Sequence, residues 1–304
     1  MGTGRGPRAH RPGVLAAGAV RREADVLENQ LLVDRPGWLD WPWALRVLAQ
    51  EVRVPGEEVR AAEGMVATAC LVADEPVVIT VTGGESQLTV KPSARAPGEF
   101  VARRFHLDLD ETAVDAALEK STLAGLFERD GWVRRPAAAM LWSYCLVFLC
   151  GGDPDAPPVR QLFAELGRPA GQLRLPPDPA DLLTAGDRRI VGYGVAPHRA
   201  ANVTGLARAF AARPDRYDEA TLRALPGDEA IARIAELPHI GPTRARAISS
   251  TALGHDDVLP DLARQDEQLR SRLGLGWSQI RAAARHAAPY RSVLGDTLLE
   301  LLSD

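Results

Sequence analysis

Residues 228–261 read DEAIARIAELPHIGPTRARAISSTALGHDDVLPD, and this stretch decides the fold. Its apolar residues recur every three or four positions on both sides of Leu237-Pro238-His239-Ile240-Gly241, which predicts two short helices joined by a tight hairpin. The first helix is expected over residues 228–236 and the second over residues 242–253, with Pro242 in its first turn. The apolar positions that the second helix should bury are Ala245, Ile248 and Ala252.

A hairpin of this kind is suited to binding anions. Its backbone N–H groups lie at a helix N-terminus and point outward, so a DNA phosphate can bind there with little help from basic side chains. We therefore predict a DNA-binding surface made of His239, Gly241, Thr243, Arg244 and Arg246.

The charge of the chain limits how it can bind DNA. The 304 residues carry a net charge of −4, and residues 1–22 contain five arginines and no acidic residue, so the rest of the chain carries −9. Binding by bulk positive charge is excluded, and a local surface is required. The three cysteines (Cys70, Cys145 and Cys150) do not suit a disulfide framework or a zinc site.

The N-terminal third of the sequence predicts a small sheet. Asp40 offers a helix N-cap and Pro42 a proline in the first turn. Three β-branched runs, separated by turn-type residues at hairpin spacing, predict antiparallel strands at residues 65–72, 76–82 and 87–90.

From about Glu99 onward the periodicity is helical, and no further strand is expected. The predicted helices cover residues 99–104, 111–118, 137–149, 158–166, 179–183, 199–211, 219–224, 228–236, 242–253, 261–273, 278–287 and 290–302.

The predicted fold class is α+β, with a small N-terminal antiparallel sheet domain followed by a mostly α-helical, two-lobed region. The expected units are a disordered basic tail at 1–27, an α+β sheet domain at 28–107, a helical domain at 108–228, and the hairpin with the remaining helices at 229–304. No apolar run approaches the roughly 20 residues of a membrane span, so a cytoplasmic protein is expected. We also expect the protein to be a monomer and to associate with the nucleoid.

Asp261 lies 20 residues after the hairpin glycine, directly after Pro260 and before a further expected helix. Hairpin, helix, loop and aspartate in this order resemble the helix-hairpin-helix DNA glycosylase superfamily. Outside this region, Asp40-Trp41-Pro42-Trp43-Ala44-Leu45, Arg103-Arg104-Phe105-His106-Leu107-Asp108 and Ala288-Pro289-Tyr290-Arg291-Ser292 are similar to segments of its bacterial alkylpurine glycosylases. The resemblance covers most of the chain beyond residue 27.

The resemblance implies a base-excision enzyme that flips a damaged, alkylated purine out of double-stranded DNA and cleaves its N-glycosidic bond. It implies a catalytic carboxylate that stabilises positive charge on the sugar. Asp261 is the first candidate and Asp266 the rival. The spacing to Gly274 favours Asp266, whereas a continuous helix from Asp261 would place Asp266 beyond its first turn and favours Asp261.

Strand cleavage in this superfamily requires a lysine amine on the second helix of the hairpin, and Thr243 stands at that position. The resemblance therefore implies hydrolysis without lyase activity. No cysteine follows Cys150, so no iron–sulfur cluster is expected and no cofactor is required. The resemblance also implies a structural K⁺ or Na⁺ bound by the backbone carbonyls of Ala235, Leu237 and Ile240.

For the flipped base, an aromatic pocket would attract a cationic alkylated purine, and the candidates on one expected helix are Trp142, Tyr144 and Phe148. Plain core packing of these rings is the alternative. Two departures from the family pattern, His239 in place of a hairpin glycine and an unusual loop at residues 149–157, keep a second function open. That alternative is a DNA-binding relative that has lost catalysis.

Overall fold

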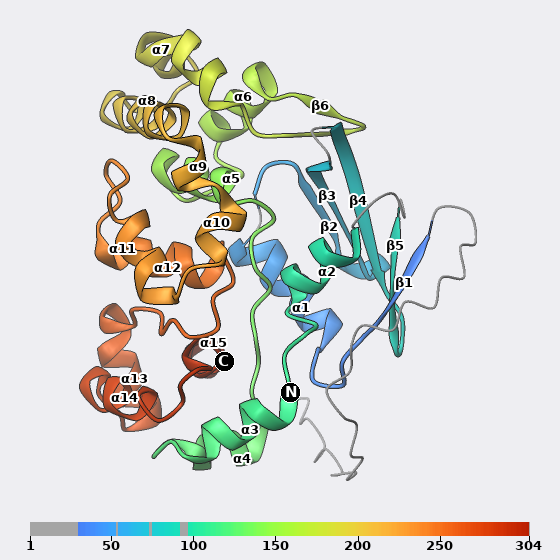
Figure 1. Cartoon of the computed structure of the whole chain (residues 1–304), viewed down its shortest axis with the longest axis vertical. Helices are drawn as coiled ribbons and strands as arrows, with labels where there is room; N and C mark the ends of the chain where they lie inside the picture. The colour runs from blue at the N-terminus through green and yellow to red at the C-terminus, as the bar shows by residue number, and fades with distance from the viewer. Residues whose placement is uncertain (1–29, 53, 73–74, 92–96, 304) are drawn as a thin grey trace.

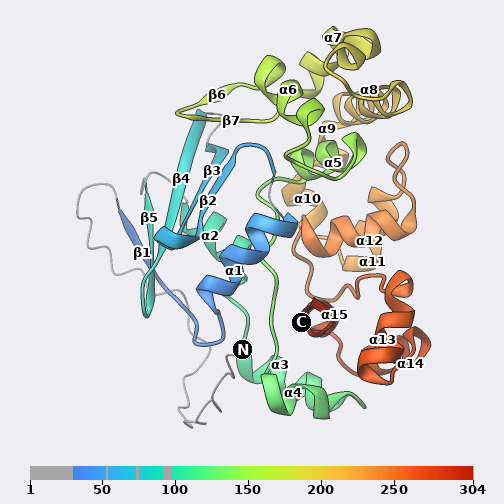
Figure 2. The same cartoon turned by 180° about the vertical axis from the view of Figure 1, so that it is seen from behind.

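The computed structural model describes residues 30–52, 54–72, 75–91 and 97–303, so the predicted basic tail lies outside the described residues. A sheet stands on one side of the molecule and a larger array of helices on the other (Figures 1 and 2). One hydrophobic core runs from Val33 in the first strand to Leu302 near the C-terminus. The α+β class is therefore confirmed. No helix among the described residues has the length and apolar character needed to cross a membrane.

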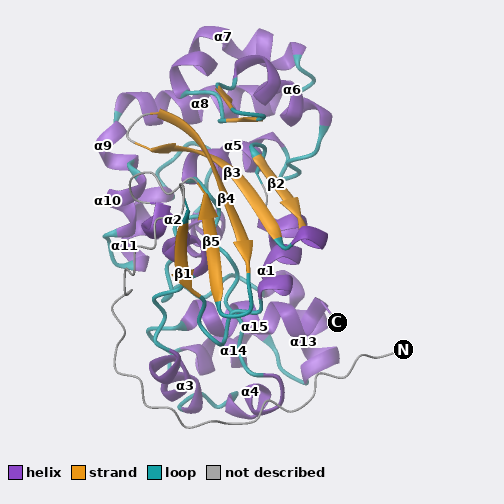
Figure 3. Ribbon diagram, turned by 90° about the vertical axis from the view of Figure 1, so that its right-hand side faces the viewer, coloured by secondary structure: helices purple, strands orange, loops and turns teal. Residues whose placement is uncertain are grey.

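The sheet has five strands in the order β1-β5-β4-β3-β2, and each neighbouring pair is antiparallel (Figure 3). The bounds are β1 (Leu31–Asp34), β2 (Glu57–Arg60), β3 (Met65–Val72), β4 (Glu75–Gly83) and β5 (Gln87–Lys91). Alternating side chains, such as Ile79 and Val81 in β4, point into the core. The three predicted strands are confirmed. The sequence did not reveal β1 and β2, which are only four residues long.

Two helices pack between the sheet and the helical body: α1 (Trp41–Val47), continued by a π-helical turn (Leu48–Val52), and α2 (Pro97–Phe105) (Figure 1). The Asp40 carboxylate caps α1 by accepting the Trp43 N–H at 3.0 Å, as predicted. The Trp41 and Phe105 rings join the two helices with their centroids 4.9 Å apart. A 3-10 turn (Ala61–Glu63) precedes β3.

The remaining chain is mostly helical. Its elements are α3 (Glu111–Glu119), α4 (Ala124–Asp130), α5 (Leu141–Cys150), α6 (Pro157–Leu166), β6 (Pro169–Ala170), β7 (Leu173–Arg174), α7 (Pro179–Gly192), α8 (Pro197–Ala212), α9 (Pro214–Tyr217), α10 (Glu219–Arg223), α11 (Gly227–Ile234), α12 (Pro242–Thr251), a 3-10 turn (Ala263–Gln265), α13 (Asp266–Leu273), α14 (Trp277–Ala284) and α15 (Arg291–Ser303).

Several predicted boundaries were wrong, each for a local reason. The helix expected at 137–149 begins only at Leu141, because residues 131–140 are extended. The helix expected to end at residue 183 continues to Gly192 through a kink at Gly186, whose φ of 67° only glycine adopts readily. The short β6–β7 hairpin contradicts the expectation of no further strand, and α4 was not predicted.

Residues 108–228 include helices at two opposite ends of the molecule (Figures 1 and 2). Helices α3 and α4 lie at the same end of the molecule as α13 and α14, whereas α6, α7 and α8 lie at the opposite end (Figures 1 and 2). The Ser121 hydroxyl donates to the carbonyl of Ala283 at 3.5 Å, and the Val133 N–H donates to the Thr297 hydroxyl at 3.1 Å. Residues 131–140 then cross between the two ends.

Candidate active site

The predicted hairpin is present between α11 and α12. His239 adopts φ 64°, so this turn holds a non-glycine residue in the left-handed region. Gly241 is the N-cap of α12, and apart from its chain neighbours no atom of the described residues lies within 4 Å of the position that a Cβ would take there. The buried face of α12 contains Ala245 and Ile248. The start of α12 therefore faces open space with its first-turn N–H groups available.

The predicted DNA-binding residues lie on and around this turn. His239, Gly241, Thr243 and Arg244 are exposed, and Arg246 is half-buried. Arg244 donates to the carbonyl of His239 at 3.0 Å, and its guanidinium carbon lies 4.9 Å from the centre of the Phe148 ring. These two contacts hold Arg244 in place on the hairpin.

Asp261 lies next to the hairpin, on the loop that follows α12. Its Oδ2 accepts the Thr243 hydroxyl at 3.2 Å, and its Oδ1 accepts the N–H of Ala263 at 3.1 Å. The side chain is half-buried. Two hydrogen bonds thus orient the carboxylate. One of them comes from Thr243, which stands at the position where strand cleavage would require a lysine.

Asp266 has different surroundings. Its Oδ1 accepts the Trp277 N–H at 2.6 Å and its Oδ2 accepts Nε of Arg270 at 2.9 Å. These hydrogen bonds, from Trp277 first and Arg270 second, lower the pKa of Asp266. The expected continuous helix over residues 261–273 is wrong, because a 3-10 turn precedes α13 and Asp266 lies in the first turn of α13. Our helix-based reason for preferring Asp261 therefore fails. The observation that separates the two is that Asp266 ties α13 to α14.

Asp261 lines a hollow of about 710 Å³, which we call the Asp261 hollow. Helices α12 and α14 contribute most of its walls, and Asp266 is not part of it. Its polar lining consists of Asp228, Thr243, Arg246, Asp261, Ser278, Arg281, Arg285 and Arg291. Ser278, Arg281 and Arg285 were not predicted as site residues, although they recur at the spacing of one helix face.

A buried arginine anchors the loop that carries Asp261. Arg134, in the extended segment 131–140, is 2% exposed in its side chain and donates to Asp296 at 2.6 Å and to Asp256 at 3.1 Å. It also donates to the carbonyl of His255 at 3.3 Å. Ser292 of α15 donates to the carbonyl of Val258 at 2.6 Å. The loop before Asp261 is therefore fixed from both sides.

His106 completes this anchor. Its Nδ1 lies 3.5 Å from Oδ1 of Asp256, and the ring is buried. Burial first, and then the charges of Arg134 and Arg223, hold the pKa of His106 well below its usual range. The imidazole is therefore neutral at pH 7.

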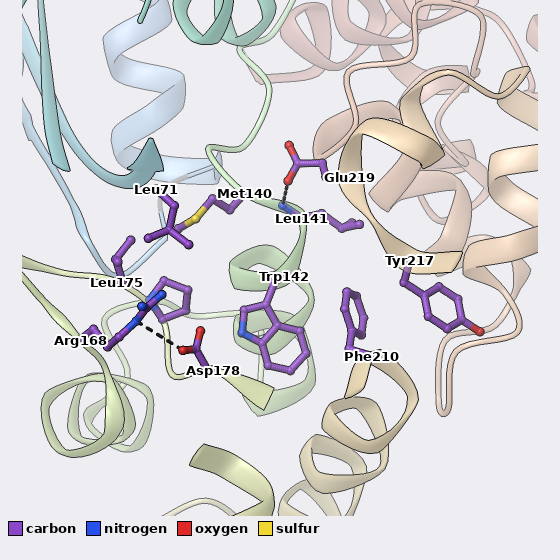
Figure 4. A pocket seen from close by; sticks show the side chains of 11 residues that line it. Leu71, Met140, Leu141, Trp142, Arg168, Leu175, Asp178, Phe210, Tyr217 and Glu219 are labelled. Atoms are coloured by element: carbon purple, nitrogen blue, oxygen red, sulfur yellow. Dashed lines mark hydrogen bonds and ion pairs between the residues drawn. The ribbon is translucent and has the colours of Figure 1, made fainter. Parts of the chain in front are cut away.

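The three predicted base-pocket rings do not line the Asp261 hollow. Trp142 lines a separate cavity of about 200 Å³, the Trp142 cavity, where it donates to the carbonyl of Pro177 at 2.7 Å and its ring centre lies 4.9 Å from that of Phe210 (Figure 4). Phe148 contacts Arg244, and Tyr144 packs half-buried against the main core. Of the three rings, only Trp142 lines the Trp142 cavity, and none lines the hollow that contains Asp261.

The hairpin carbonyl oxygens are the kind of ligand that the expected monovalent cation would need. Residues 235–240 follow the C-terminus of α11, where carbonyl oxygens outnumber N–H donors. Leu237 accepts the N–H of Ile240 at 3.1 Å, which leaves its second lone pair free. In the described part of the chain, no group of three or more His, Cys, Asp or Glu side chains is placed to hold a metal ion.

All three cysteines are free and buried. Burial raises the pKa of Cys70 to about 11 and the pKa values of Cys145 and Cys150 to about 12. Their thiols stay protonated near neutral pH, so they are not candidates for a nucleophile.

No protein-family model matches this sequence, and no curated protein shows significant similarity to it. Solved structures do. The 3-methyladenine DNA-glycosylase of Archaeoglobus fulgidus superposes with a TM-score of 0.64 at 14% identity, covering 89% of this chain and 96% of that one. The 8-oxoguanine glycosylase/lyase of Clostridium acetobutylicum gives 0.62 at 13%, covering 91% and 96%. MBOgg1, solved with a low-affinity DNA ligand, gives 0.61 at 15%, covering 93% and 96%.

These similarities extend over nearly the whole length of both chains, and at such identities they show a shared fold. The chain thus has the fold of helix-hairpin-helix DNA glycosylases, as the sequence resemblance implied. The two named activities, on 3-methyladenine and on 8-oxoguanine, belong to those proteins.

Proposed function

We propose that this protein is a DNA glycosylase that removes alkylated purines from duplex DNA by hydrolysis. The observation that supports it best is the placement of Asp261. Its carboxylate is held by Thr243 in the first turn of the hairpin's second helix, at the edge of the surface that faces open space. A phosphate bound at the start of α12 would therefore bring a nucleotide next to Asp261.

The chemistry follows from the carboxylate. When the bond between C1′ and the base nitrogen breaks, the electron pair leaves with the base and positive charge develops on the sugar. The Asp261 carboxylate stabilises that charge, and a water molecule then adds to C1′ and gives up a proton to this carboxylate, which releases it to solvent. The hydrogen bonds from Thr243 and Ala263 fix the direction of the carboxylate, so it does not have to reorient as the charge develops.

The proposed reaction is hydrolysis without a lyase step. A lyase step would need an amine to form a Schiff base, and Thr243 carries a hydroxyl instead. The only lysines in the chain are Lys91 and Lys120. Both are exposed, and neither lines the Asp261 hollow.

We further propose that the carbonyls of Ala235, Leu237 and Ile240 hold a K⁺ or Na⁺ ion. Such an ion would neutralise the negative end of the α11 dipole and strengthen phosphate binding at the hairpin. The protein's own residues carry out the excision.

The test uses duplex DNA containing 3-methyladenine or 7-methylguanine, with 8-oxoguanine paired to cytosine as a comparison lesion. We expect release of the alkylated bases, intact abasic sites and no covalent adduct after borohydride treatment. A trapped adduct would overturn hydrolysis as the only step. Tight binding of lesion DNA without release of any base would favour the alternative, a DNA-binding relative without catalysis.

A further inference from the structure

Helix α14 presents a polar face that the packing of the fold does not require. Ile280, Ala283 and Ala284 bury the opposite face of this helix. Ser278, Arg281 and Arg285 are exposed, and all three line the Asp261 hollow. Because core packing is complete without them, their position calls for a different explanation.

The arginines of the Asp261 hollow differ in how their charge is balanced. Arg291 donates twice to Asp257, at 2.6 and 3.0 Å. Among the ion pairs of the described residues, none includes Arg246, Arg281 or Arg285. A chain with a net charge of −4 thus gathers three arginines without an ion-pair partner among the described residues in one hollow, beside the carboxylates of Asp228 and Asp261.

The chemistry of this lining selects an anion. The three guanidinium groups outnumber the carboxylates of Asp228 and Asp261, so the bare hollow favours an anion over a cationic alkylated base. Phosphate suits it well, since the planar guanidinium fork donates two parallel hydrogen bonds to phosphate oxygens and the Ser278 hydroxyl can donate a third. The start of α12 binds phosphate through backbone N–H groups, and α14 offers side chains across the same hollow.

We propose that α14 forms a second phosphate-binding surface, in which Ser278, Arg281 and Arg285, with Arg246 opposite, bind the backbone of the DNA strand that carries the flipped nucleotide. This inference rests on the proposed function. The phosphates flanking that nucleotide would neutralise the arginines, so that the charge felt at the sugar is set by Asp261.

The experiment measures how binding depends on salt. Duplex DNA containing an uncleavable abasic-site analogue is titrated with wild type and with Arg281→Gln, Arg285→Gln and the double variant, over a series of NaCl concentrations. The slope of log K against log [salt] is negative, and each lost phosphate contact reduces its magnitude by about 0.9. The slope of the double variant should therefore be less steep by about 1.8. The matched control is Arg160→Gln, an exposed arginine on α6 outside the hollow, which should leave the slope unchanged.

A structural role gives a different result. Arg281 in the last turn of α14 and Arg285 at its C-cap also interact favourably with the helix dipole. If that were their only role, the double variant would melt at a lower temperature while keeping the wild-type salt slope, and this outcome would overturn the inference. Double replacement by lysine, which keeps the charge, should preserve the salt slope.

Excision separates this inference from the proposed function. If wild type excised the base normally and the variants kept the wild-type salt slope, the proposed α14 surface would be contradicted and the proposed function would stand. Absence of both lesion binding and excision in wild type would overturn the proposed function together with the inference.

Discussion

The Asp261 hollow and the Trp142 cavity are built from opposite kinds of side chain. The first is lined by four arginines and two aspartates and has a volume of about 710 Å³. The second, of about 200 Å³, is lined mainly by apolar and aromatic residues and joins α5 to the ends of α8 and α9 and to the β7 region (Figure 4). The Asp261 hollow contains three arginines without an ion-pair partner in the described part of the chain, whereas the Trp142 cavity contains rings that already contact each other.

This difference indicates where function and stability reside. Aromatic side chains at helical spacing satisfy a core as readily as a base pocket, and Trp142 has its indole N–H bonded within the protein. Unpaired charges are costly to gather without a ligand. Changes in the Asp261 hollow should therefore act on DNA and leave folding intact, while changes in the Trp142 cavity should act on folding and leave chemistry intact.

The largest expected effect comes from Asp261→Asn. The amide keeps the shape of the carboxylate but cannot stabilise a cation, so single-turnover excision should fall by about 10²–10³-fold or more, with lesion binding retained. Asp266→Asn is the matched control and should change excision little, since Asp266 ties α13 to α14. Loss of excision in the Asp266 variant with normal Asp261→Asn activity would reverse the assignment.

Gly241→Asp should have the next largest effect. A carboxylate at the N-cap of α12 would stand against the bound phosphate, and duplex affinity should fall by about tenfold or more in a fluorescence titration. Deleting residues 1–22, which removes five arginines, should weaken binding by only about threefold. If the deletion proved the more damaging change, the hairpin would not be the main DNA-binding surface.

Trp142→Leu tests the other side of the comparison. Loss of the ring contact with Phe210 and of the hydrogen bond to Pro177 should lower the free energy of unfolding by about 2 kcal/mol. The excision rate per folded molecule should stay near wild type. Denaturant unfolding and single-turnover assays on the same preparation measure both, and a selective loss of excision would restore Trp142 to the base pocket.

The smallest expected effect is on the loop anchor of Asp261. The pKa of His106 is lower in the folded protein than in the unfolded chain, where it is about 6.5, so protonation favours unfolding. Stability should be full above about pH 7 and decrease by about 1 kcal/mol as the pH falls below 6.5. In the variant His106→Asn, the asparagine tolerates the φ of 51° and does not titrate, so the pH dependence should be weaker in urea unfolding at pH 7.5 and 5.5.

Part of the pH dependence should remain in this variant, because burial also lowers the pKa of His255. Equal pH dependence in variant and wild type would contradict the role of His106.

Much of the fold follows from local patterns in the sequence. The hairpin, the Asp40 cap and strands β3 to β5 each depend on residues close together in the chain, and all were predicted. The break between residues 261 and 266 was not, because the hydrogen bond from Trp277 that fixes Asp266 comes from 11 residues away. Nor did the sequence show that α3 and α4 lie beside the C-terminal helices, since that depends on contacts such as Ser121 with Ala283.

The candidate site was predictable only in part. The spacing from the hairpin to Asp261 identified a carboxylate, and Thr243 was noted as the residue at the lysine position. The hydrogen bond between them became visible only in three dimensions. The α14 arginines were overlooked because exposed arginines are common in this chain, and only their shared hollow distinguishes Arg281 and Arg285 from the rest.

The pairing of Arg134 with Asp296 also sets an order of events during synthesis. The two residues are 162 positions apart. A ribosome adds about 5–20 residues per second, so roughly 10–30 s pass between the appearance of the arginine and that of its carboxylate. Until α15 has emerged, the guanidinium lacks Asp296 and the loop before Asp261 is anchored from one side only. The nascent chain can complete its sheet early, but the loop before the proposed catalytic carboxylate gains its contacts with Asp296 and Ser292 only after α15 has emerged.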